Sequence, residues 1–399
     1  MRFPPVVAFG TLAYLVPSTY AWGAAGHEIV ATIAQMYVHP RALETMCDIL
    51  DLPSNNCYLA RVATWADQQR MRMRWSGPLH YVGALDDHPS DTCAFPGSRG
   101  WAGNRGINVL DGVKNTTSLL QDWVNHESSD DVASEALKFL IHFVGDMHQP
   151  LHLTGRDRGG NSVKVLFDRR HTNLHSLWDS LLIAKAVRTV PRNYSQPLPY
   201  PRIEAALRGT IYDSYVRRIM WEGVLNSWDD DLEEWLSCPV PDVPTTSPGG
   251  LLGMWNMAYS TTTKLVQAFL RDGVEISPDG PILCPYHWSQ PNHQLNCEII
   301  WPKELDEPPF NVRFDSSDEE ELAHGHDDDL EDPEPMLGEL PLLQLDTPQY
   351  SGVIARRMIL EKLLAQGGIR LAGILNYIFA DEDEFERGQR GAFLTKLDD

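Results

Sequence analysis

Two pairs of histidine and aspartate are spaced so that each could bind one metal ion. His142 and Asp146 in FLIHFVGDMHQP, and His175 and Asp179 in HTNLHSLWDSLL, stand four positions apart in segments with helical apolar spacing. Residues four apart lie on one face of a helix, so each pair can contact the same cation. Mixed imidazole and carboxylate ligands suit zinc. Either pair alone also fits exposed helix residues, but two pairs close together, with His152 between them, favour a metal site.

The N-terminus carries a second unusual feature. Residues 1–21 read as a secretory signal peptide, with Arg2, an apolar stretch and small residues before a cleavage site after Ala21. Cleavage there would make Trp22 the first residue of the mature chain, and its free amine and carbonyl oxygen could chelate a metal ion. His27 follows within the next predicted helix. The simpler reading is that the mature chain merely begins at this point and that His27 is an ordinary helix residue.

Seven segments, in order, give the chain a close resemblance to a known family. The chain resembles the zinc-dependent, single-strand-specific nucleases of fungi and plants, the type I nucleases, over most of residues 22–183 and again over about 346–380. The motifs are WGAAGHEIVATIA, ATWADQQR, WSGPLHYV, FLIHFVGDMHQPLH, GGNSVKVLF, HTNLHSLWDS and LAQGGIRLAGILNYIF. The resemblance implies an almost entirely helical fold, related to that of zinc-dependent phospholipase C, with three zinc ions at the bottom of a cleft.

The resemblance also implies nine metal ligands, and all nine are present. They would form three sets: Asp67, His80, His142 and Asp146 for one zinc ion; Trp22, His27 and the bridging Asp146 for its close neighbour; and His152, His175 and Asp179 for the third. A complete set of ligands indicates a catalytic member of the family rather than a decayed, non-catalytic one.

The implied chemistry is hydrolysis of a phosphodiester. Zinc lowers the pKa of bound water from about 15.7 to about 7–9, so a hydroxide shared by the bridged pair of ions would attack phosphorus in line. The third ion would stabilise the departing 3′-oxygen. Asp67 would orient this nucleophile as well as bind metal, and Arg70, on the same helix face, could contact the phosphate with its forked guanidinium. Arg70 equally fits an ordinary surface residue of a helix.

Candidate substrate contacts follow from the same resemblance. Tyr81, directly after His80, matches an aromatic position that stacks on an unpaired base, although filling of the core is an alternative. Asn161 in the GGN run is assigned to substrate binding, and Asn173 to the support of a metal ligand; the glycines of that run also fit an ordinary turn. The fungal members often have an acidic residue where this chain has Gly83, so its base preference is open.

Composition sets limits on these assignments. The chain has 399 residues, 43% of them hydrophobic, and 12 tryptophans, which is enough for a large core. Its formal net charge of −22 is unusual for a protein that binds nucleic acid. However, zinc ions would add local positive charge, and residues 303–346 contain 16 Asp or Glu against two basic residues. The charge therefore does not exclude a nucleic-acid substrate.

The apolar pattern predicts an all-α, multi-helix single domain, and the resemblance implies that this domain holds a trinuclear zinc cleft. We expect this domain to comprise residues 22–302 and 346–380, with a small β-hairpin around SVKVLF as its sheet content. Residues 303–345 have the acidic, Pro-containing composition of a disordered insertion, and residues 381–399 form a C-terminal tail. Helical spacing recurs over 26–38, 58–73, 107–124, 131–149, 173–187, 201–220, 250–272 and 352–379.

Cysteines and sequons are consistent with export. Six cysteines in a chain with a signal peptide predict disulfides rather than zinc thiolates, although the sequence alone does not choose among the pairings. Asn115 in NTT and Asn193 in NYS are glycosylation sequons. The resemblance implies that Cys93 pairs with Cys297; Cys47 with Cys57 is then a plausible local loop, which leaves Cys238 with Cys284.

We therefore predict a secreted, zinc-dependent endonuclease that cleaves single-stranded DNA and RNA to 5′-phosphorylated products and removes 3′-phosphates from mononucleotides. We expect a monomer with no stable protein partner and no membrane attachment. Two other readings compete: a phospholipase C on the same scaffold, and a secreted zinc-binding protein without catalysis. The ATWAD, GGN and HTNLHSLWDS motifs favour the nuclease over the phospholipase, and ligand sets with an open position favour catalysis.

Overall fold

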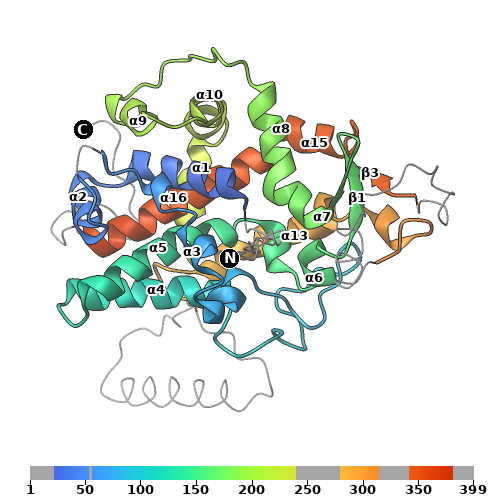
Figure 1. The fold of residues 1–399 in the computed structure, drawn as a ribbon, viewed down its shortest axis with the longest axis horizontal. Coiled ribbons are helices and arrows are strands. Elements are labelled where there is room, and N and C mark those ends of the chain that lie inside the picture. Colours follow the sequence, from blue (N-terminus) through green and yellow to red (C-terminus); the bar gives the residue numbers. More distant parts are fainter. Residues whose placement is uncertain (1–21, 54–55, 240–278, 314–340, 381–399) are drawn as a thin grey trace, which may run out of the picture.

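Helices packed around a central pair form most of the protein (Figure 1). The structure, a computed structural model, describes residues 22–53, 56–239, 279–313 and 341–380. The central pair is α1 (Ala24–Tyr37) and α16 (Ile359–Phe379), which are far apart in the sequence and lie side by side. The mainly helical fold predicted from the sequence is thus confirmed. The signal peptide, the helix over 250–272 and the C-terminal tail were predicted in segments outside the described residues.

Two glycines allow α16 to approach α1 closely. A Cβ atom at Gly368 would lie 2.6 Å from Ile33 Cβ, and one at Gly367 would lie 3.3 Å from Val30 Cγ2. Larger side chains at these positions would push the helices apart. Because α1 also carries His27, this contact fixes one predicted metal ligand against the C-terminal helix.

The helical hairpin of α4 (Val109–Val124) and α5 (Asp130–Asp146) carries the first His–Asp pair. Asn108 caps α4 by accepting hydrogen bonds from the backbone N–H groups of Leu110 and Asp111, and Ser129 caps α5. Acidic residues in the first turn of α5 are favourable because they face the positive end of the helix dipole. The N-terminus of α5 is polar, whereas its C-terminal half is apolar and buried. This buried half carries His142 and Asp146.

The second His–Asp pair lies on three consecutive helical segments. These are α7 (Leu174–Ser176), the π-helical η5 (Leu177–Leu181) and α8 (Leu182–Thr189). The Asn173 side chain accepts a hydrogen bond from Ser176 N and so caps the start of α7. The π-helical segment includes Asp179, and the His175 and Asp179 side chains still meet, with Nε2 and Oδ2 3.1 Å apart.

Two helices expected to be continuous are broken. The expected helix over 58–73 is two short pieces, and that over 201–220 divides at Gly209, where φ is +82°. The remaining helical segments are α2 (Pro40–Ile49), η2 (Leu59–Arg61), α3 (Trp65–Gln69), η3 (Arg74–His80), η4 (Pro150–Leu153), α6 (Asp157–Gly160), α9 (Pro201–Ala206), α10 (Asp213–Arg218), η6 (Ile219–Ser227), η7 (Asp229–Asp231), α11 (Leu232–Leu236), α13 (Pro285–Leu295), η8 (Asn296–Ile300), η9 (Lys303–Asp306) and α15 (Ser351–Arg356).

A small sheet has the order β2-β1-β3. β1 (Lys164–Phe167) and β2 (Arg170–Asn173) form the expected antiparallel hairpin, with Val165 opposite Thr172. β3 (Leu343–Gln344) pairs with β1 in parallel. The hairpin leads directly into α7 and therefore positions the second His–Asp pair.

The predicted boundaries of the acidic insertion, 303–345, are wrong at both ends. Leu305 in η9 is fully buried, and Asp306 forms ion pairs with Arg156 and Arg313. At the other end, β3 joins the sheet and Leu345 is buried. Apolar burial and paired charge hold these flanks to the fold, and only residues 314–340 of the predicted insertion lie outside the described residues.

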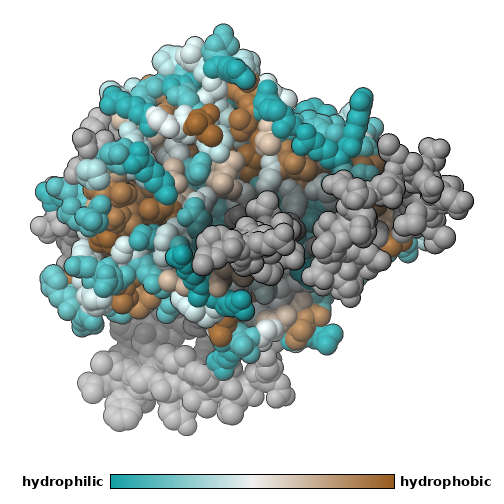
Figure 2. Space-filling view, in the orientation of Figure 1, coloured by the Kyte–Doolittle hydropathy of each residue, from teal (hydrophilic) through white to brown (hydrophobic). Residues whose placement is uncertain are grey.

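Hydrophilic side chains cover much of the face shown in Figure 2, and apolar ones form separate patches. Among the residues that the structure describes, none of the helices combines the length and apolar content needed to span a lipid bilayer.

Candidate metal centre

Asp146 lies at the centre of the predicted metal site. It ends α5, is fully buried and is surrounded by three histidine rings. Its carboxylate oxygens lie 3.4 Å from His27 Nε2, 3.0 Å from His80 Nδ1 and 3.4 Å from His142 Nε2. Gly145 contributes by having no side chain, since a Cβ there would lie 2.5 Å from His27 Nδ1. Three elements, α1, η3 and α5, thus bring a histidine to one carboxylate.

Asp67 on α3 supplies a second carboxylate to this cluster. Its Oδ1 lies 3.5 Å from His142 Nε2 and 3.9 Å from His80 Nδ1. His27 stacks on His142, with ring centroids 3.8 Å apart. The potential ligand atoms form two overlapping groups within 4.8 Å: His27, Asp67 and His142, and His80, His142 and Asp146. Five of the predicted ligands therefore converge.

A third group of potential ligands adjoins the first two. It comprises His152, His175 and Asp179. His175 Nε2 lies 3.1 Å from Asp179 Oδ2, and His152 Nε2 lies 3.9 Å from Asp179 Oδ1. His152 Nδ1 also lies 3.7 Å from Asp146 Oδ1. The site is thus continuous from His27 to Asp179.

Backbone carbonyls orient three of the imidazole rings. Nδ1 of His142 lies 2.7 Å from Ala63 O, that of His152 lies 2.6 Å from His80 O, and that of His175 lies 2.7 Å from Gly159 O. A carbonyl oxygen only accepts, so each Nδ1 carries the proton and donates it. Nε2 of each ring is then left with a lone pair directed at the carboxylates, as in a metal-binding histidine.

The site contains buried polar atoms without hydrogen-bond partners among the described residues. Buried polar atoms in proteins are normally paired, and a set of unpaired imidazole nitrogens and carboxylate oxygens is a suitable ligand set for zinc. The residues therefore fit a metal cluster. These atoms are both ring nitrogens of His27, Asp67 Oδ2, His80 Nε2, His142 Nε2, Asp146 Oδ1 and His152 Nε2.

The charges of the site act on the pKa values of its members. Burial lowers the pKa of His142, but the negative charges of Asp146 and Asp67 outweigh burial and raise it to about 9. Burial likewise opposes ionisation of Asp146, yet His142 and the other rings hold the pKa of its carboxyl well below the usual range. The cluster thus favours bound positive charge, and a metal ion competes with protons for the same nitrogens.

Trp22 is placed at the edge of this cluster. Its side chain is fully buried, and Gly23 N donates a hydrogen bond to Asp179 O over 2.8 Å. A Cβ at Gly26 would lie 2.8 Å from Trp22 Cβ. The start of the predicted mature chain is therefore tied to the helix that carries Asp179. Metal binding by the Trp22 amine and carbonyl stays a prediction.

The GGN run lies against the third group of ligands. Gly159 and Gly160 have φ values of +65° and +83°, which favour glycine. A Cβ at Gly159 would lie 2.7 Å from Leu151 O and 3.2 Å from His175 Nδ1. Asn161 donates from Nδ2 to Arg158 O, while its Oδ1 is buried without a partner among the described residues. The glycines thus permit the contact that orients His175.

Tyr81 and Arg70 flank the cluster on the side of α3 and η3. Tyr81 follows η3 and is 50% exposed, so it does not fill the core. Arg70 is the C-cap residue of α3, and its backbone N–H donates to Asp67 O. Tyr81 therefore directly follows a predicted ligand in the chain, and Arg70 lies three residues after another.

Gly83 has a structural reason to depart from the acidic residue of the fungal nucleases. A Cβ at this position would lie 2.5 Å from Gly155 N and 2.7 Å from Gly155 Cα. Val82 N also donates to His152 O over 2.8 Å, which holds the segment against the metal site. Close backbone contact therefore leaves no room for a side chain at this position.

Gln149 is a positioning residue that sequence reasoning missed. It is fully buried, donates from Nε2 to Asp179 Oδ1 and accepts from Leu151 N through Oε1. It thereby joins the start of η4, which bears His152, to Asp179. Its place before Pro150 at a helix start was a usable signal, because polar side chains commonly cap such turns.

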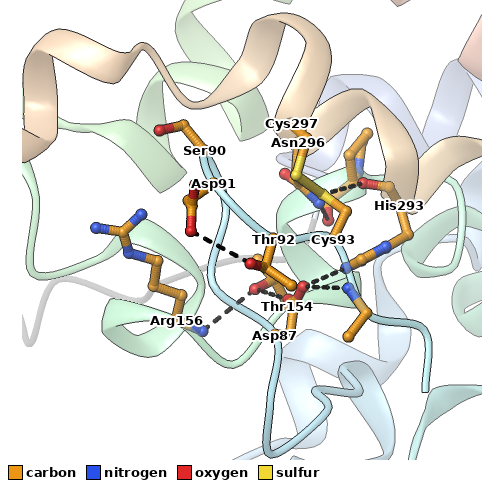
Figure 3. The surroundings of a disulfide bond; sticks show 12 residues. Asp87, Ser90, Asp91, Thr92, Cys93, Thr154, Arg156, His293, Asn296 and Cys297 are labelled. Atoms are coloured by element: carbon orange, nitrogen blue, oxygen red, sulfur yellow. Dashed lines mark hydrogen bonds and ion pairs between the residues drawn. A yellow bond between two sulfur atoms is a disulfide. The ribbon is translucent and has the colours of Figure 1, made fainter. Parts of the chain in front are cut away.

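A second missed group lies around Asp87, next to the Cys93–Cys297 disulfide (Figure 3). The Asp87 carboxylate accepts hydrogen bonds from Ala94 N over 3.0 Å and from the Thr154 hydroxyl. His293 Nε2 lies 3.1 Å from Asp87 Oδ1. Cys93 is held in the disulfide, so the group is not a thiolate metal site. It connects the loop after Tyr81 to the segment after His152.

His148, which the sequence did not assign as a ligand, faces away from the cluster. Its Nδ1 lies 2.7 Å from Val144 O, and its Nε2 lies 2.8 Å from Arg370 Nη1. Arg370 is buried and also donates to the Trp235 and Trp288 carbonyls. His148 therefore stabilises the packing of α5 against α16 and is not a metal ligand.

All six cysteines form disulfides, and the asparagines of the two sequons are exposed. Asn115 on α4 and Asn193 after α8 are exposed. The bonded pairs are Cys47–Cys57, Cys93–Cys297 and Cys238–Cys284, the same pairs that the sequence suggested.

The fold and the site define a mainly helical protein with a continuous cluster of potential metal ligands. The chain belongs to the S1/P1 nuclease family, whose model matches residues 22–242. It is 30% identical to Endonuclease 2 of Arabidopsis thaliana over 263 residues, 63% of this chain and 82% of the relative.

Two fungal relatives share more identity over shorter regions. Nuclease P1 of Penicillium citrinum is 40% identical over 168 residues, 42% of this chain. Nuclease S1 of Aspergillus oryzae is 38% identical over 181 residues, 45% of this chain. The aligned region covers 60% of each of these relatives.

Proposed function

We propose that this chain is a secreted, zinc-dependent endonuclease that hydrolyses single-stranded DNA and RNA to 5′-phosphorylated products. We also propose that it removes 3′-phosphates from mononucleotides. One observation carries the proposal: Asp146 has two histidine rings near each of its oxygens. Oδ1 faces His27 and His152, and Oδ2 faces His80 and His142. One carboxylate can therefore serve adjoining metal positions.

The residues fit three zinc ions in the sets expected from the sequence. Trp22, His27 and Asp146 would hold one ion, and Asp67, His80, His142 and Asp146 its neighbour, while His152, His175 and Asp179 would hold the third. When bound, zinc supplies activated water near neutral pH and positive charge for the phosphoryl oxygens. Because His27 also lies within ligand distance of Asp67 and His142, the first two sets overlap.

Asp67 is suited to handle the proton of the attacking water. Its Oδ1 faces His142, whereas its Oδ2 is buried without a hydrogen-bond partner among the described residues. A buried carboxylate oxygen with no partner can accept a hydrogen bond from water and fix its orientation. We therefore assign Asp67 a role in orienting the nucleophile as well as in binding metal.

Arg70 and Tyr81 would position the substrate. Arg70 is the C-cap residue of the helix that carries Asp67. Its guanidinium can contact two phosphate oxygens at once. Tyr81, half exposed next to His80, can stack on an unpaired base. A base inside a duplex presents no free face, so stacking explains preference for single strands. Asn161, with an unpaired Oδ1, is a further candidate for substrate contact, and Asn173 supports His175 by capping its helix.

Three disulfides support an oxidising, extracellular location. The exposed sequon asparagines Asn115 and Asn193 fit passage through the secretory route. We propose that residues 1–21 direct this export and that the mature enzyme acts as a monomer on nucleic acid, without membrane attachment.

Metal analysis combined with substrate comparison tests the proposal. The mature protein should contain about three zinc atoms by elemental analysis, and it should degrade heat-denatured DNA and RNA much faster than duplex DNA. Release of choline phosphate from phosphatidylcholine, without cleavage of single strands, would instead indicate a phospholipase C. Bound zinc with no phosphodiester hydrolysis across a range of pH would indicate a zinc-binding protein.

A further inference from the structure

The segment between the ligands Asp67 and His80 is locally basic in a very acidic protein. Arg70, Arg72 and Arg74 lie in this segment, and no Asp or Glu occurs between Asp67 and Asp86. The whole chain has a formal net charge of −22. The segment between two predicted metal ligands is therefore positively charged, whereas the chain as a whole is strongly negative.

Two of these arginines are available for a ligand. Arg72 and Arg74 are exposed, and neither has an ion-pair partner among the residues that the structure describes. Elsewhere, Arg156 pairs with Asp306 and Arg217 pairs with Glu204. A guanidinium in water binds phosphate oxygens well because it offers paired donors and permanent charge.

Trp75, next to these arginines, exposes a large aromatic surface. It is 59% exposed, which is unusual for so large an apolar side chain. Its ring lies against Phe139, with centroids 5.6 Å apart and planes at 58°. Phe139 in turn stacks on Phe143 at 5.1 Å, and Phe143 meets the His80 ring edge-on at 5.3 Å. Three ring contacts therefore fix Trp75 relative to the metal centre.

Trp75 and Tyr81 lie at the two ends of η3. Both are at least half exposed, and the ligand His80 immediately precedes Tyr81. Trp75 also borders a groove of about 560 Å³ whose walls include Asp111, Asp131 and Glu135. These carboxylates disfavour phosphates within the groove. A nucleic-acid backbone would therefore follow the arginines rather than the groove.

We infer that Arg72, Arg74 and Trp75, the arginine–tryptophan strip, form an additional binding subsite for single-stranded nucleic acid, away from the scissile phosphate. The arginines contact backbone phosphates, and Trp75 stacks on an unpaired base beyond the one at Tyr81. This combination of basic side chains and exposed aromatics is how proteins bind single strands without sequence preference. The inference rests on the proposed nuclease function and predicts that long strands are preferred to short ones.

Chain-length dependence of cleavage by the zinc-loaded enzyme tests the strip. kcat and KM are measured on oligothymidylates of 3 and 30 nucleotides for wild type, R72A/R74A, W75A and W75F. R192A/R208A is the matched control, because both of its arginines are exposed and lie in the chain between α8 and α10, outside the arginine–tryptophan strip. We expect the ratio of kcat/KM for the 30-mer to that for the trimer to fall about tenfold in R72A/R74A and W75A. W75F, which keeps an aromatic face, should retain most of the ratio.

Salt dependence separates charge from stacking. Loss of two phosphate contacts should make the slope of log KM against log salt concentration shallower by about 1.4 in R72A/R74A, while W75A keeps the wild-type slope. The control variant should keep both the ratio and the slope. If all variants keep the wild-type ratio, the strip does not bind substrate. If W75A lowers the melting temperature and slows both oligonucleotides equally, Trp75 is a packing residue and the inference is wrong. If the wild type cleaves neither oligonucleotide, the proposed nuclease function itself fails.

Discussion

His80 Nδ1 lies 3.0 Å from Asp146 Oδ2, although the two residues are 66 positions apart in the chain. Asp146 is fully buried and its second oxygen faces His27 and His152. Replacement by Asn removes the charge that these rings share. We expect Asp146→Asn to lose about two of the three zinc ions and more than about 100-fold in activity, since even indirect partners of a ligand are worth 10–100-fold. Elemental analysis and single-strand hydrolysis measure both effects.

The matched control for that variant is Asp157→Asn. Asp157 is an aspartate outside the cluster, and it pairs with Arg313. It should retain zinc and most of the activity. Wild-type turnover by Asp146→Asn would contradict the bridging role of this carboxylate.

Gly83 should not tolerate the acidic residue found in fungal nucleases. A Cβ at this position would meet Gly155 N at 2.5 Å, so Gly83→Asp must displace backbone next to His152. We expect a loss of about 1–3 kcal/mol in the free energy of unfolding and no gain of base preference. Urea denaturation and cleavage of the four homopolymers measure these effects.

Gly77→Asp serves as the comparison, because a Cβ at Gly77 has no neighbour within 4 Å. It should cost less stability than Gly83→Asp. A stable Gly83→Asp enzyme with a new base preference would show that the loop can move and that the acidic position can be restored.

Glu361 on α16 should make stability depend on pH. It is 2% exposed, and burial raises the pKa of its carboxyl above the ordinary 4.5, although the Arg218 charge opposes this shift. Because its pKa is raised in the folded state, Glu361 contributes fully to the free energy of unfolding below pH 4.5, and this contribution is lost as pH rises through the folded-state pKa. We expect Glu361→Gln to remove this part of the fall in stability with rising pH. Melting temperatures of both proteins from pH 4 upward, with saturating zinc, measure the difference. Curves that stay parallel throughout would contradict the prediction.

Residues 314–340 should reduce cleavage of long strands at low salt. They contain 12 Asp or Glu and no Lys or Arg. Replacing them with a neutral linker, while keeping η9 and β3, removes like-charge repulsion. We expect kcat/KM for a long single strand to rise about two- to fivefold near 10 mM salt and to match wild type near 500 mM, where charges are screened within a few ångströms. An unchanged salt dependence would count against this role.

Local spacing made much of the site predictable. His142 with Asp146, and His175 with Asp179, each stand one helical turn apart, and that periodicity is visible without any tertiary information. The SVKVLF alternation likewise predicted the hairpin that leads to α7. The predicted acidic insertion included residues that belong to the fold, because composition does not reveal that Leu305 and Leu345 are buried.

Contacts between distant segments were beyond the reach of the sequence. Gln149 reaches Asp179, and Asp87 joins Thr154 and His293, through side chains separated by 30 or more positions. The position of Gln149 before Pro150 indicates a helix cap, but nothing in the spacing of these residues indicates which distant side chains they contact. Their pairing depends on how the helices pack.

The sequence by itself therefore determined two His–Asp pairs that could bind metal, because ligand chemistry and helical period are local properties, and its resemblance to a family implied the other ligands. Only the tertiary structure decided that one buried carboxylate, Asp146, lies among four histidines from three separate parts of the chain. The physical reason is that apolar packing, including the close contact of Gly368 with Ile33, sets the relative positions of α1, α5 and their neighbours. Packing of this kind is a sum over many distant contacts and leaves no periodic mark in the chain.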